Sequence, residues 1–305
     1  MYYLGIEIGG TKLQAALGDG LEQVHSCERI AAKPEAGAEG IRKQLLQLVT
    51  ELLQKSKVQL KQIKACGIGF GGPVDDRTQN TITSHQVNGW DNFALAQWAK
   101  ENWSIPTVIG NDADVAGLAE ATCGIGKGSN PVFYMNIGSG IGGALILDGK
   151  IHRGTGLGAG EIGHVWIDYD VDETLWHPRQ EPAWSILEHR ASGWALQKQS
   201  RCANVPDLLK AIENGDVHAE AIWIQARRRL AVALSHVIAL ICPQRIVLGG
   251  GVSLAPSHLF LEPLRKELAQ IVFPPFAECY DIQLAALGEL VVVQGALILA
   301  RQQCS

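Results

Sequence analysis

An Asn-Asp pair, Asn111-Asp112, stands where a short apolar run, 106–110, gives way to a helical pattern. Ligands of α/β proteins bind at the carboxyl ends of strands, so a carboxylate in that place could contact a ligand. The alternative is structural, because Asp is also a favoured residue at the N-cap of a helix. For Asp112 taken alone, capping is the stronger interpretation.

A second group of titratable residues lies further along the chain. Glu161 and His164 bring an acid and a base close together in a stretch too rich in glycine to be a helix. Glu188 stands near the start of a helical pattern, where an acid is favourable to the helix dipole without any function. A surface loop is the corresponding alternative for Glu161 and His164. These residues alone therefore leave binding roles and structural roles open.

Glycine is clustered rather than spread. Of 34 glycines, groups stand at 9–10, within 138–143 and at 249–251. Such clustering in an apolar, mixed sequence indicates special backbone geometry. The P-loop and dinucleotide-binding patterns are absent, yet backbone N–H groups in tight turns can bind phosphate. Segments 7–20 and 136–149 both read as strand, glycine turn, strand and Asp-Gly turn, which suggests either a duplicated half-molecule or two unrelated hairpins.

The elements that must position these residues alternate between strand-like and helix-like patterns. The expected strands are 2–8, 12–17, 63–70, 106–110, 132–137, 143–147 and 245–248. The expected helices are 40–55, 92–102, 112–123, 186–201, 219–241, 260–272 and 289–300. This alternation with crossovers indicates the α/β class, and a length of 305 residues suits two domains.

Composition argues against several classes of function. A net charge of -5 with mixed signs gives no basic patch, so nucleic acid is not expected as a partner. Seven cysteines, widely spaced and never in a C-x-x-C pattern, are typical of a reducing compartment. The most apolar helical stretch, 230–242, is too short to span a bilayer, and the N-terminus lacks the charged region of a signal peptide. We therefore expect a soluble cytoplasmic protein with no membrane partner.

Taken together, these segments resemble the ROK family (repressors, open reading frames, kinases), which includes bacterial sugar kinases of the actin-like ATPase (ribonuclease H-like) fold. The motifs that carry the resemblance are Glu7-Ile8-Gly9-Gly10-Thr11-Lys12, Gly71-Gly72-Pro73-Val74-Asp75, Asn111-Asp112-Ala113-Asp114-Val115-Ala116, Gly138-Ser139-Gly140-Ile141-Gly142-Gly143, Gly158 to His164, and Gly249-Gly250-Gly251. The resemblance implies two α/β domains around a central cleft. Residues 1–111 with 290–305 would form the smaller N-terminal domain. Residues 112–289 would form the larger C-terminal domain, with the sugar loop and the dimer interface.

The resemblance also implies a role for each motif. Asp112 would be the general base, taking the proton from a sugar hydroxyl as it attacks the γ-phosphate of ATP. Glu7 would act near Mg²⁺. The residues implied to bind the sugar are Gly72, Asn111, Asp112, Glu161, His164 and Glu188. Those implied to bind the nucleotide are Gly9, Gly10, Thr11, Lys12, Gly138, Ser139, Gly140, Gly249, Gly250 and Gly251.

Several positions depart from the family pattern. Glu7 stands in place of an Asp, Asp114 in place of the second Asn of its motif, Gly71 in place of a Pro, and Gln86 in place of an Asn. The longer side chain of Glu7 can still reach the metal through a water. Asp114 adds a charge two residues from the implied base, and it is also in a position to cap the helix.

The largest departure concerns zinc. The family carries a structural zinc site made of a histidine and three cysteines. The three aligned positions of this chain hold Arg179, Glu181 and Ile186, none of which supplies a thiolate. We therefore expect no zinc, and a loop packed by apolar side chains instead. The tryptophans expected to supply this packing are Trp166, Trp176 and Trp184.

The function that the resemblance implies is an ATP-dependent hexose kinase acting on glucose or a related aldohexose at O6. Mannose, N-acetylmannosamine, N-acetylglucosamine and fructose stay open as substrates. One alternative is a repressor, which would carry a helix-turn-helix before the first phosphate motif; that motif begins near Gly5 and leaves no room for one. Another is a non-catalytic sugar-binding or regulatory protein. The family is usually dimeric, so a homodimer is expected.

Overall fold

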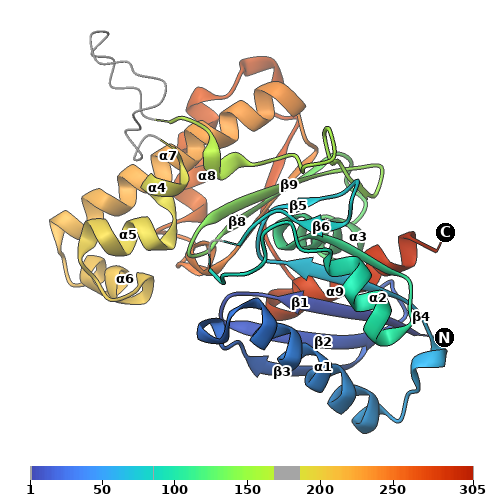
Figure 1. The fold of residues 1–305 in the computed structure, drawn as a ribbon. Coiled ribbons are helices and arrows are strands. Elements are labelled where there is room, and N and C mark those ends of the chain that lie inside the picture. Colours follow the sequence, from blue (N-terminus) through green and yellow to red (C-terminus); the bar gives the residue numbers. More distant parts are fainter. Residues whose placement is uncertain (1, 85, 168–185, 305) are drawn as a thin grey trace, which may run out of the picture. The chain divides into compact units, whose positions relative to one another are not determined.

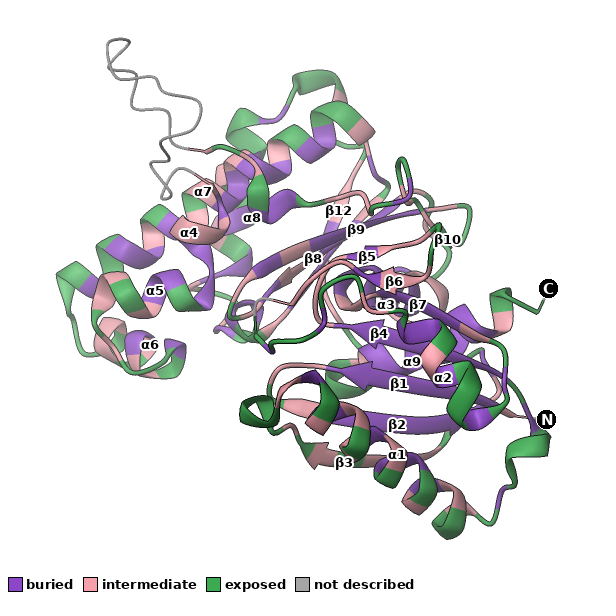
Figure 2. Cartoon of the chain, in the orientation of Figure 1, coloured by how far each residue is buried: buried purple, intermediate pink, exposed green. Residues whose placement is uncertain are grey.

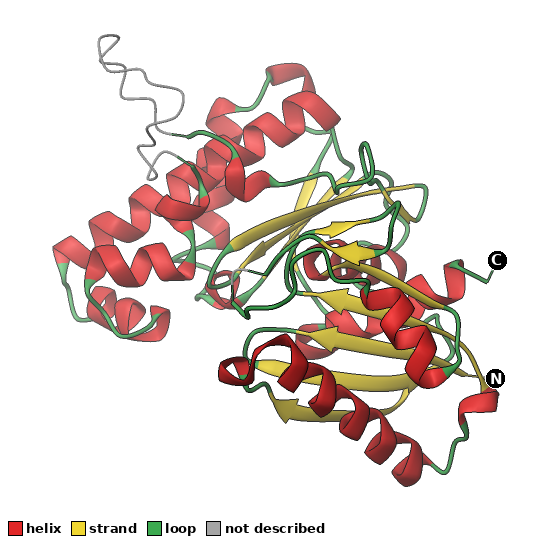
Figure 3. Ribbon diagram, in the orientation of Figure 1, coloured by secondary structure: helices red, strands yellow, loops and turns green. Residues whose placement is uncertain are grey.

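The computed structural model describes residues 2–84, 86–167 and 186–304 (Figure 1). The chain forms two compact units. The first unit consists of Met1–Gly128, Ala144–Ala159 and Ala286–Ser305, and the second of Ser129–Gly143 and Gly160–Ala285. Both units mix helices with strands (Figure 3), as the α/β class requires. None of the described helices is long and apolar enough to span a membrane.

The first unit is built on a five-stranded sheet in the order β3-β2-β1-β4-β7. Its strands are β1 (Tyr2–Ile8), β2 (Lys12–Gly18), β3 (Val24–Ala31), β4 (Ile63–Phe70) and β7 (Thr107–Asn111). Strands β1, β2 and β3 form an antiparallel meander, whereas β1, β4 and β7 run parallel. The carboxyl ends of these three parallel strands therefore meet along one edge. A separate pair, β5 (Val74–Asp75) and β6 (Asn80–Thr81), is antiparallel.

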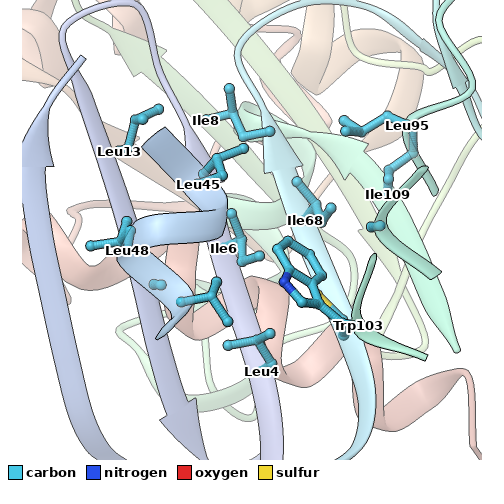
Figure 4. Close-up of a cluster of buried hydrophobic side chains, with 14 of the residues drawn as sticks. Leu4, Ile6, Ile8, Leu13, Leu45, Leu48, Ile68, Leu95, Trp103 and Ile109 are labelled. Atoms are coloured by element: carbon cyan, nitrogen blue, oxygen red, sulfur yellow. The ribbon is translucent and has the colours of Figure 1, made fainter. Parts of the chain in front are cut away.

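Helices cover both faces of this sheet. They are α1 (Gly37–Ser56), α2 (Leu95–Trp103), α3 (Asp112–Cys123) and α9 (Val291–Gln302). Leu45 and Leu48 of α1 pack with Ile6 and Ile68 of the sheet in one apolar cluster (Figure 4). Helix α9 packs on the other face through Val293, because successive side chains of a strand point to opposite faces. Since both faces are covered, β1 and β4 are buried along nearly their whole length (Figure 2).

A second five-stranded sheet has the order β10-β9-β8-β11-β12. Its strands are β8 (Val132–Ile137), β9 (Ile141–Leu147), β10 (Lys150–Ile151), β11 (Arg245–Gly249) and β12 (Asp281–Leu284). Strand β11 is parallel to both β8 and β12. The helices of the second unit are α4 (Glu188–Ala191), α5 (Gly193–Ser200), α6 (Val205–Glu213), α7 (Val217–Ile241) and α8 (Leu261–Ile271).

The two sheets repeat one topology. When β1 is matched with β8, the orders β3-β2-β1-β4-β7 and β10-β9-β8-β11-β12 become equivalent, strand for strand. In each sheet the matched pair, β1 and β2 or β8 and β9, is joined by a glycine turn. A shared strand order is what a duplicated half-molecule predicts, whereas two unrelated hairpins would not extend the match to the remaining strands.

The first unit includes more of the chain than the smaller domain expected from sequence, residues 1–111 with 290–305. It also contains α3 and residues 144–159. Helix α3 packs tightly on α9, where a Cβ added to Gly295 would overlap the carbonyl oxygen of Val115. This close approach gives α3 its place beside the C-terminal helix.

Candidate active site

The predicted site residues of the first unit gather at the carboxyl edge of its sheet. Ile8 of β1 is paired with Phe70 of β4, which is in turn paired with Asn111 of β7. The N–H of Gly71 donates to the carbonyl oxygen of Ile8 at 2.9 Å, continuing the alignment past the strand ends. The register therefore brings the first glycine turn, the Gly71-Gly72 segment and Asp112 together.

Asn111, and not Asp112, is the N-cap of α3. The Oδ1 atom of Asn111 accepts from the N–H groups of Ala113 at 2.9 Å and Asp114 at 3.4 Å. Its Nδ2 group donates to the carbonyl oxygen of Gly72 at 3.0 Å. Asn111 thus satisfies helix donors and fixes the Gly72 loop at once. The capping role that sequence alone favoured for Asp112 is wrong.

Asp112 occupies the first turn of α3, with Oδ1 accepting from the Ala113 N–H at 2.8 Å. Its Oδ2 atom lies only 3.5 Å from the position that a Cβ on Gly71 would occupy. The same Cβ would lie 3.2 Å from the Ile8 carbonyl oxygen, which is tighter than an ordinary contact. A side chain at position 71, where the family has proline, would thus be crowded by the Ile8 carbonyl oxygen and would make an ordinary contact with the Asp112 carboxylate.

Glu7 is a buried carboxylate at the end of β1, with 6% of its surface exposed. Its Oε1 atom lies 3.2 Å from the Nζ of Lys12, while its Oε2 atom is buried and finds no hydrogen-bond partner among the described residues. Burial raises the pKa of Glu7 to about 7; Lys12 opposes this rise and the negative charge of Asp112 adds to it. The two carboxylates therefore interact electrostatically.

A magnesium ion fits this donor set. Mg²⁺ is usually held by one or two carboxylates together with substrate phosphates and waters, and the unsatisfied Oε2 atom of Glu7 is an acceptor that the ion or one of its waters would satisfy. The described residues contain no cluster of three or more His, Cys, Asp and Glu side chains that would hold a metal without substrate.

The first glycine turn is closed by its own backbone and by neighbouring side chains. The Gly9 N–H donates to the Lys12 carbonyl oxygen at 3.0 Å. The Lys12 ammonium, besides its pairing with Glu7, donates to the Glu289 carbonyl oxygen at 3.3 Å. The side chain of Gln86 fills the space beside Gly10, where an added Cβ would overlap its amide oxygen. Gln86, which stands in place of an Asn of the family pattern, thus lies against the first phosphate motif.

The second glycine turn, Gly138 to Gly140, is held by the start of α5. The carbonyl oxygens of Gly138 and Ser139 accept from the N–H groups of Gly193 at 2.8 Å and Trp194 at 3.2 Å. Within the turn, the Gly138 N–H donates to the Gly140 carbonyl oxygen at 2.9 Å. These bonds fix the course of the turn at the end of β8, where the sequence predicts phosphate binding.

Glu188 contacts this second turn directly. Its Oε2 atom accepts from the N–H of Ile141 at 2.7 Å, and a Cβ added to Gly140 would lie 2.5 Å from the same oxygen. The resemblance implied sugar binding for Glu188, with no indication of this tie. In the structure, one carboxylate oxygen is engaged by the turn at the start of β9.

Glu161 and His164 bracket a short 3-10 helix, Ile162–His164, and lie close together. The Glu161 Oε2 and His164 Nδ1 atoms are 3.7 Å apart, and the two side chains are 56% and 64% exposed. The Leu187 N–H donates to the Val165 carbonyl oxygen at 3.0 Å. An antiparallel bridge between Trp166 and Ile186 continues this contact. His164 and Glu188 are therefore each next to one residue of the Val165–Leu187 pair.

The three glycines at the end of β11 have different reasons to be glycine. A Cβ on Gly249 would overlap the Tyr134 hydroxyl, and one on Gly250 would lie 2.5 Å from the Ile137 backbone. Gly250 also has φ 87°, which favours glycine. Gly251 faces open space. Packing therefore explains the first two, while Gly251 is the one whose bare backbone is open to a ligand.

The expectation of tryptophan packing in place of zinc is not met at Trp166, which is 53% exposed. Trp176, Trp184, Arg179 and Glu181, on which the rest of this expectation depends, lie outside the described residues.

The pattern of the ROK family matches the chain over residues 3–303. The chain belongs to the ROK family. Among curated proteins, this ROK protein is 26% identical to a glucokinase of Halalkalibacterium halodurans, over 99% of this chain and 96% of the relative. It is 28% identical to an N-acetylmannosamine kinase of Escherichia coli O1:K1, over 98% of this chain and 100% of the relative.

Solved structures of ROK proteins are similar along the whole chain. The ROK hexokinase of Thermus thermophilus is 26% identical with a TM-score of 0.83, covering 100% of this chain and 99% of that one. The ROK family glucokinase of Streptomyces griseus, solved with glucose and AMPPNP, is 26% identical with a TM-score of 0.78, covering 99% and 100%. The predicted actin-like ATPase fold of this ROK protein is confirmed.

Proposed function

We propose that this ROK protein is an ATP-dependent sugar kinase that transfers the γ-phosphate of ATP to a hydroxyl of a hexose. The observation that carries the proposal is that Asn111 and Asp112 have different roles at the start of α3. Because Asn111 caps the helix, the adjacent Asp112 carboxylate is not needed for capping. It lies at the carboxyl edge of the sheet, where α/β proteins bind ligands.

In the proposed reaction, Asp112 accepts the proton of the attacking hydroxyl. Such a base contributes about 10²–10⁴ in rate. Phosphoryl transfer depends otherwise on positioning and charge neutralisation, and a bound Mg²⁺ would supply the positive charge beside Glu7. The glycine turns at 9–10 and 138–140, together with Gly251, would offer backbone to the nucleotide. The N–H groups of Gly9 and Gly138 bond within their own turns, so the phosphate would be bound by other N–H groups of these glycine-rich segments.

For the sugar we propose glucose or a related aldohexose, phosphorylated at O6. Glu161, His164 and Glu188 are two carboxylates and an imidazole, which can hydrogen-bond several hydroxyls of one ring. A site of this kind discriminates strongly, because a missing hydroxyl leaves a polar group unpaired. The named relatives include a glucokinase and an N-acetylmannosamine kinase, so both sugars belong in a test panel with mannose, N-acetylglucosamine and fructose.

The experiment is a kinase assay with Mg²⁺-ATP over this panel, on the wild type and on Asp112→Asn. We expect one aldohexose to give a sugar phosphate, identified as the 6-phosphate by NMR. Asp112→Asn should lower kcat at least about 100-fold while sugar affinity changes little. Binding of a sugar without turnover of any panel member would instead favour a non-catalytic sugar-binding protein. We further propose that the protein is a cytoplasmic homodimer. Analytical ultracentrifugation would test the oligomeric state.

A further inference from the structure

Glu120, near the end of α3, is a completely buried carboxylate with 0% exposure. Three backbone N–H groups donate to it. Oε2 accepts from Ile125 at 3.0 Å, and Oε1 accepts from Ala286 and Leu287, each at 2.9 Å. A buried carboxylate is unfavourable unless it is hydrogen-bonded, and bonds to an ionised acceptor are the strong ones. The side chain thus joins α3 to two segments that are far apart in the sequence.

Those two segments are connections between the units. The chain passes between the units four times, after residues 128, 143, 159 and 285, and the two segments belong to the first and the last of these connections. Ile125 therefore stands just before the exit, and Ala286 and Leu287 begin the return. A Cβ on Gly124 would overlap the Glu120 Oε2 atom, so the exit segment also wraps tightly around this carboxylate. One side chain fixes the first-unit ends of these two connections, the first and the last of the four.

The same helix carries the proposed general base. Asp112 is the first residue of α3 and Glu120 lies about two helical turns further on. Both residues belong to one continuous hydrogen-bonded helix, which is packed against α9. The proposed base and the carboxylate that holds the two connections thus stand on one continuous helix.

We propose that Glu120 is a positioning residue, which ties both connections to the helix that bears Asp112 so that the connections and the base move together. This inference rests on the proposed kinase function only where it concerns turnover. The carboxylate touches no reacting group; it acts through the backbone that it holds.

The test is the substitution Glu120→Gln, which keeps the shape of the side chain. The amide retains one oxygen acceptor and gains an NH₂ group that cannot accept. It can serve either the Ile125 N–H or the Ala286–Leu287 pair, but not both. We expect amide hydrogen exchange to become roughly 10- to 100-fold faster at one of these two places, measured on the ligand-free protein.

Glu267→Gln is the matched control. Glu267 is a half-buried carboxylate of the second unit that pairs with Arg227 through both oxygens, at 2.8 and 2.9 Å. The substitution should destabilise the protein without changing amide hydrogen exchange at Ile125 or at Ala286 and Leu287. Unchanged exchange at all three amides in Glu120→Gln would overturn the proposal.

Two further measurements separate positioning from simple stabilisation. In the wild type, the bound sugar should slow exchange at Ile125, Ala286 and Leu287, and Glu120→Gln should lose this response at the freed amide. Its kcat should fall at least about 10-fold with the sugar Kd within about 2-fold, a split expected of misplaced chemistry. A normal kcat, or no response of the wild-type amides to sugar, would leave Glu120 a structural residue and refute the coupling. Absence of turnover in the wild type would refute the kinase proposal, while the exchange response still decides this one.

Discussion

Glu7→Gln should change how the stability of the protein depends on pH. Burial raises the pKa of Glu7 from 4.5 to about 7. Between these two values the unfolded chain gives up the proton of Glu7 while the folded chain keeps it. The contribution of Glu7 to the free energy of unfolding is therefore fully present below pH 4.5, where Glu7 is protonated in both states. It is lost as the pH rises through about 7. Glutamine has nearly the same shape and does not titrate.

The size of the effect follows from the shift. One pKa unit corresponds to about 1.4 kcal/mol, so the shift from 4.5 to about 7 amounts to about 3 kcal/mol in total. Most of this, about 2.5 kcal/mol, falls between pH 5 and pH 8. The free energy of unfolding of the wild type, relative to that of Glu7→Gln, should decrease by this amount over that interval. Above pH 8 the difference should be flat.

The assay is urea unfolding of both proteins at several pH values from 5 to 8, without Mg²⁺, since the ion would bind the ionised carboxylate. Glu39→Gln is the control, because Glu39 is an exposed partner of Lys43 in the same unit and its substitution should give a flat difference. A flat difference for Glu7→Gln would show that Glu7 is ionised throughout, and would refute the reasoning from burial.

Further predictions concern the second unit. Gly250→Ala should lower the Tm markedly, because position 250 has φ 87° and its Cβ would meet the Ile137 backbone, whereas Gly251→Ala should fold normally and weaken ATP binding, as calorimetry would show. Glu188→Gln should raise KM for both ATP and sugar, because the carboxylate also holds the second glycine turn; Glu161→Gln should raise KM for sugar only, and equal effects of the two variants would contradict this. Metal analysis of the purified protein should find no stoichiometric zinc.

Local sequence patterns predicted most of the elements but missed several, among them strand β3 and the amphipathic helix α6. Strand β3 (Val24–Ala31) was not expected, because as the edge strand it is partly exposed and carries polar and charged residues. The single helix expected over 186–201 is two helices, α4 and α5. Ser192 caps α5 by accepting from the Ala195 N–H, and a serine inside a helical pattern does not reveal whether it caps or continues the helix.

The residue types of the candidate site could be predicted from the sequence, but the hydrogen-bond partners of its side chains could not. A motif of Asn and Asp at a strand end allows either residue to be the cap, and only the backbone conformation of Asn111 decides it. The bond between Glu188 and the Ile141 N–H joins residues 47 positions apart. Glu120 likewise receives bonds from residues more than a hundred positions away, and no spacing rule covers such contacts.

The glycines also show which contacts a sequence does not reveal. Gly124 and Gly140 each leave space that a carboxylate uses: Glu120 and Glu188 have oxygens 2.5 Å or less from where a Cβ would be. In sequence these glycines look like turn residues, since a turn and a space for a distant side chain require the same absent Cβ. Substituting such a glycine by alanine therefore displaces a carboxylate encoded elsewhere. A loss of activity in Gly140→Ala is evidence about Glu188 as much as about phosphate binding, unless Glu188→Gln is measured in the same background.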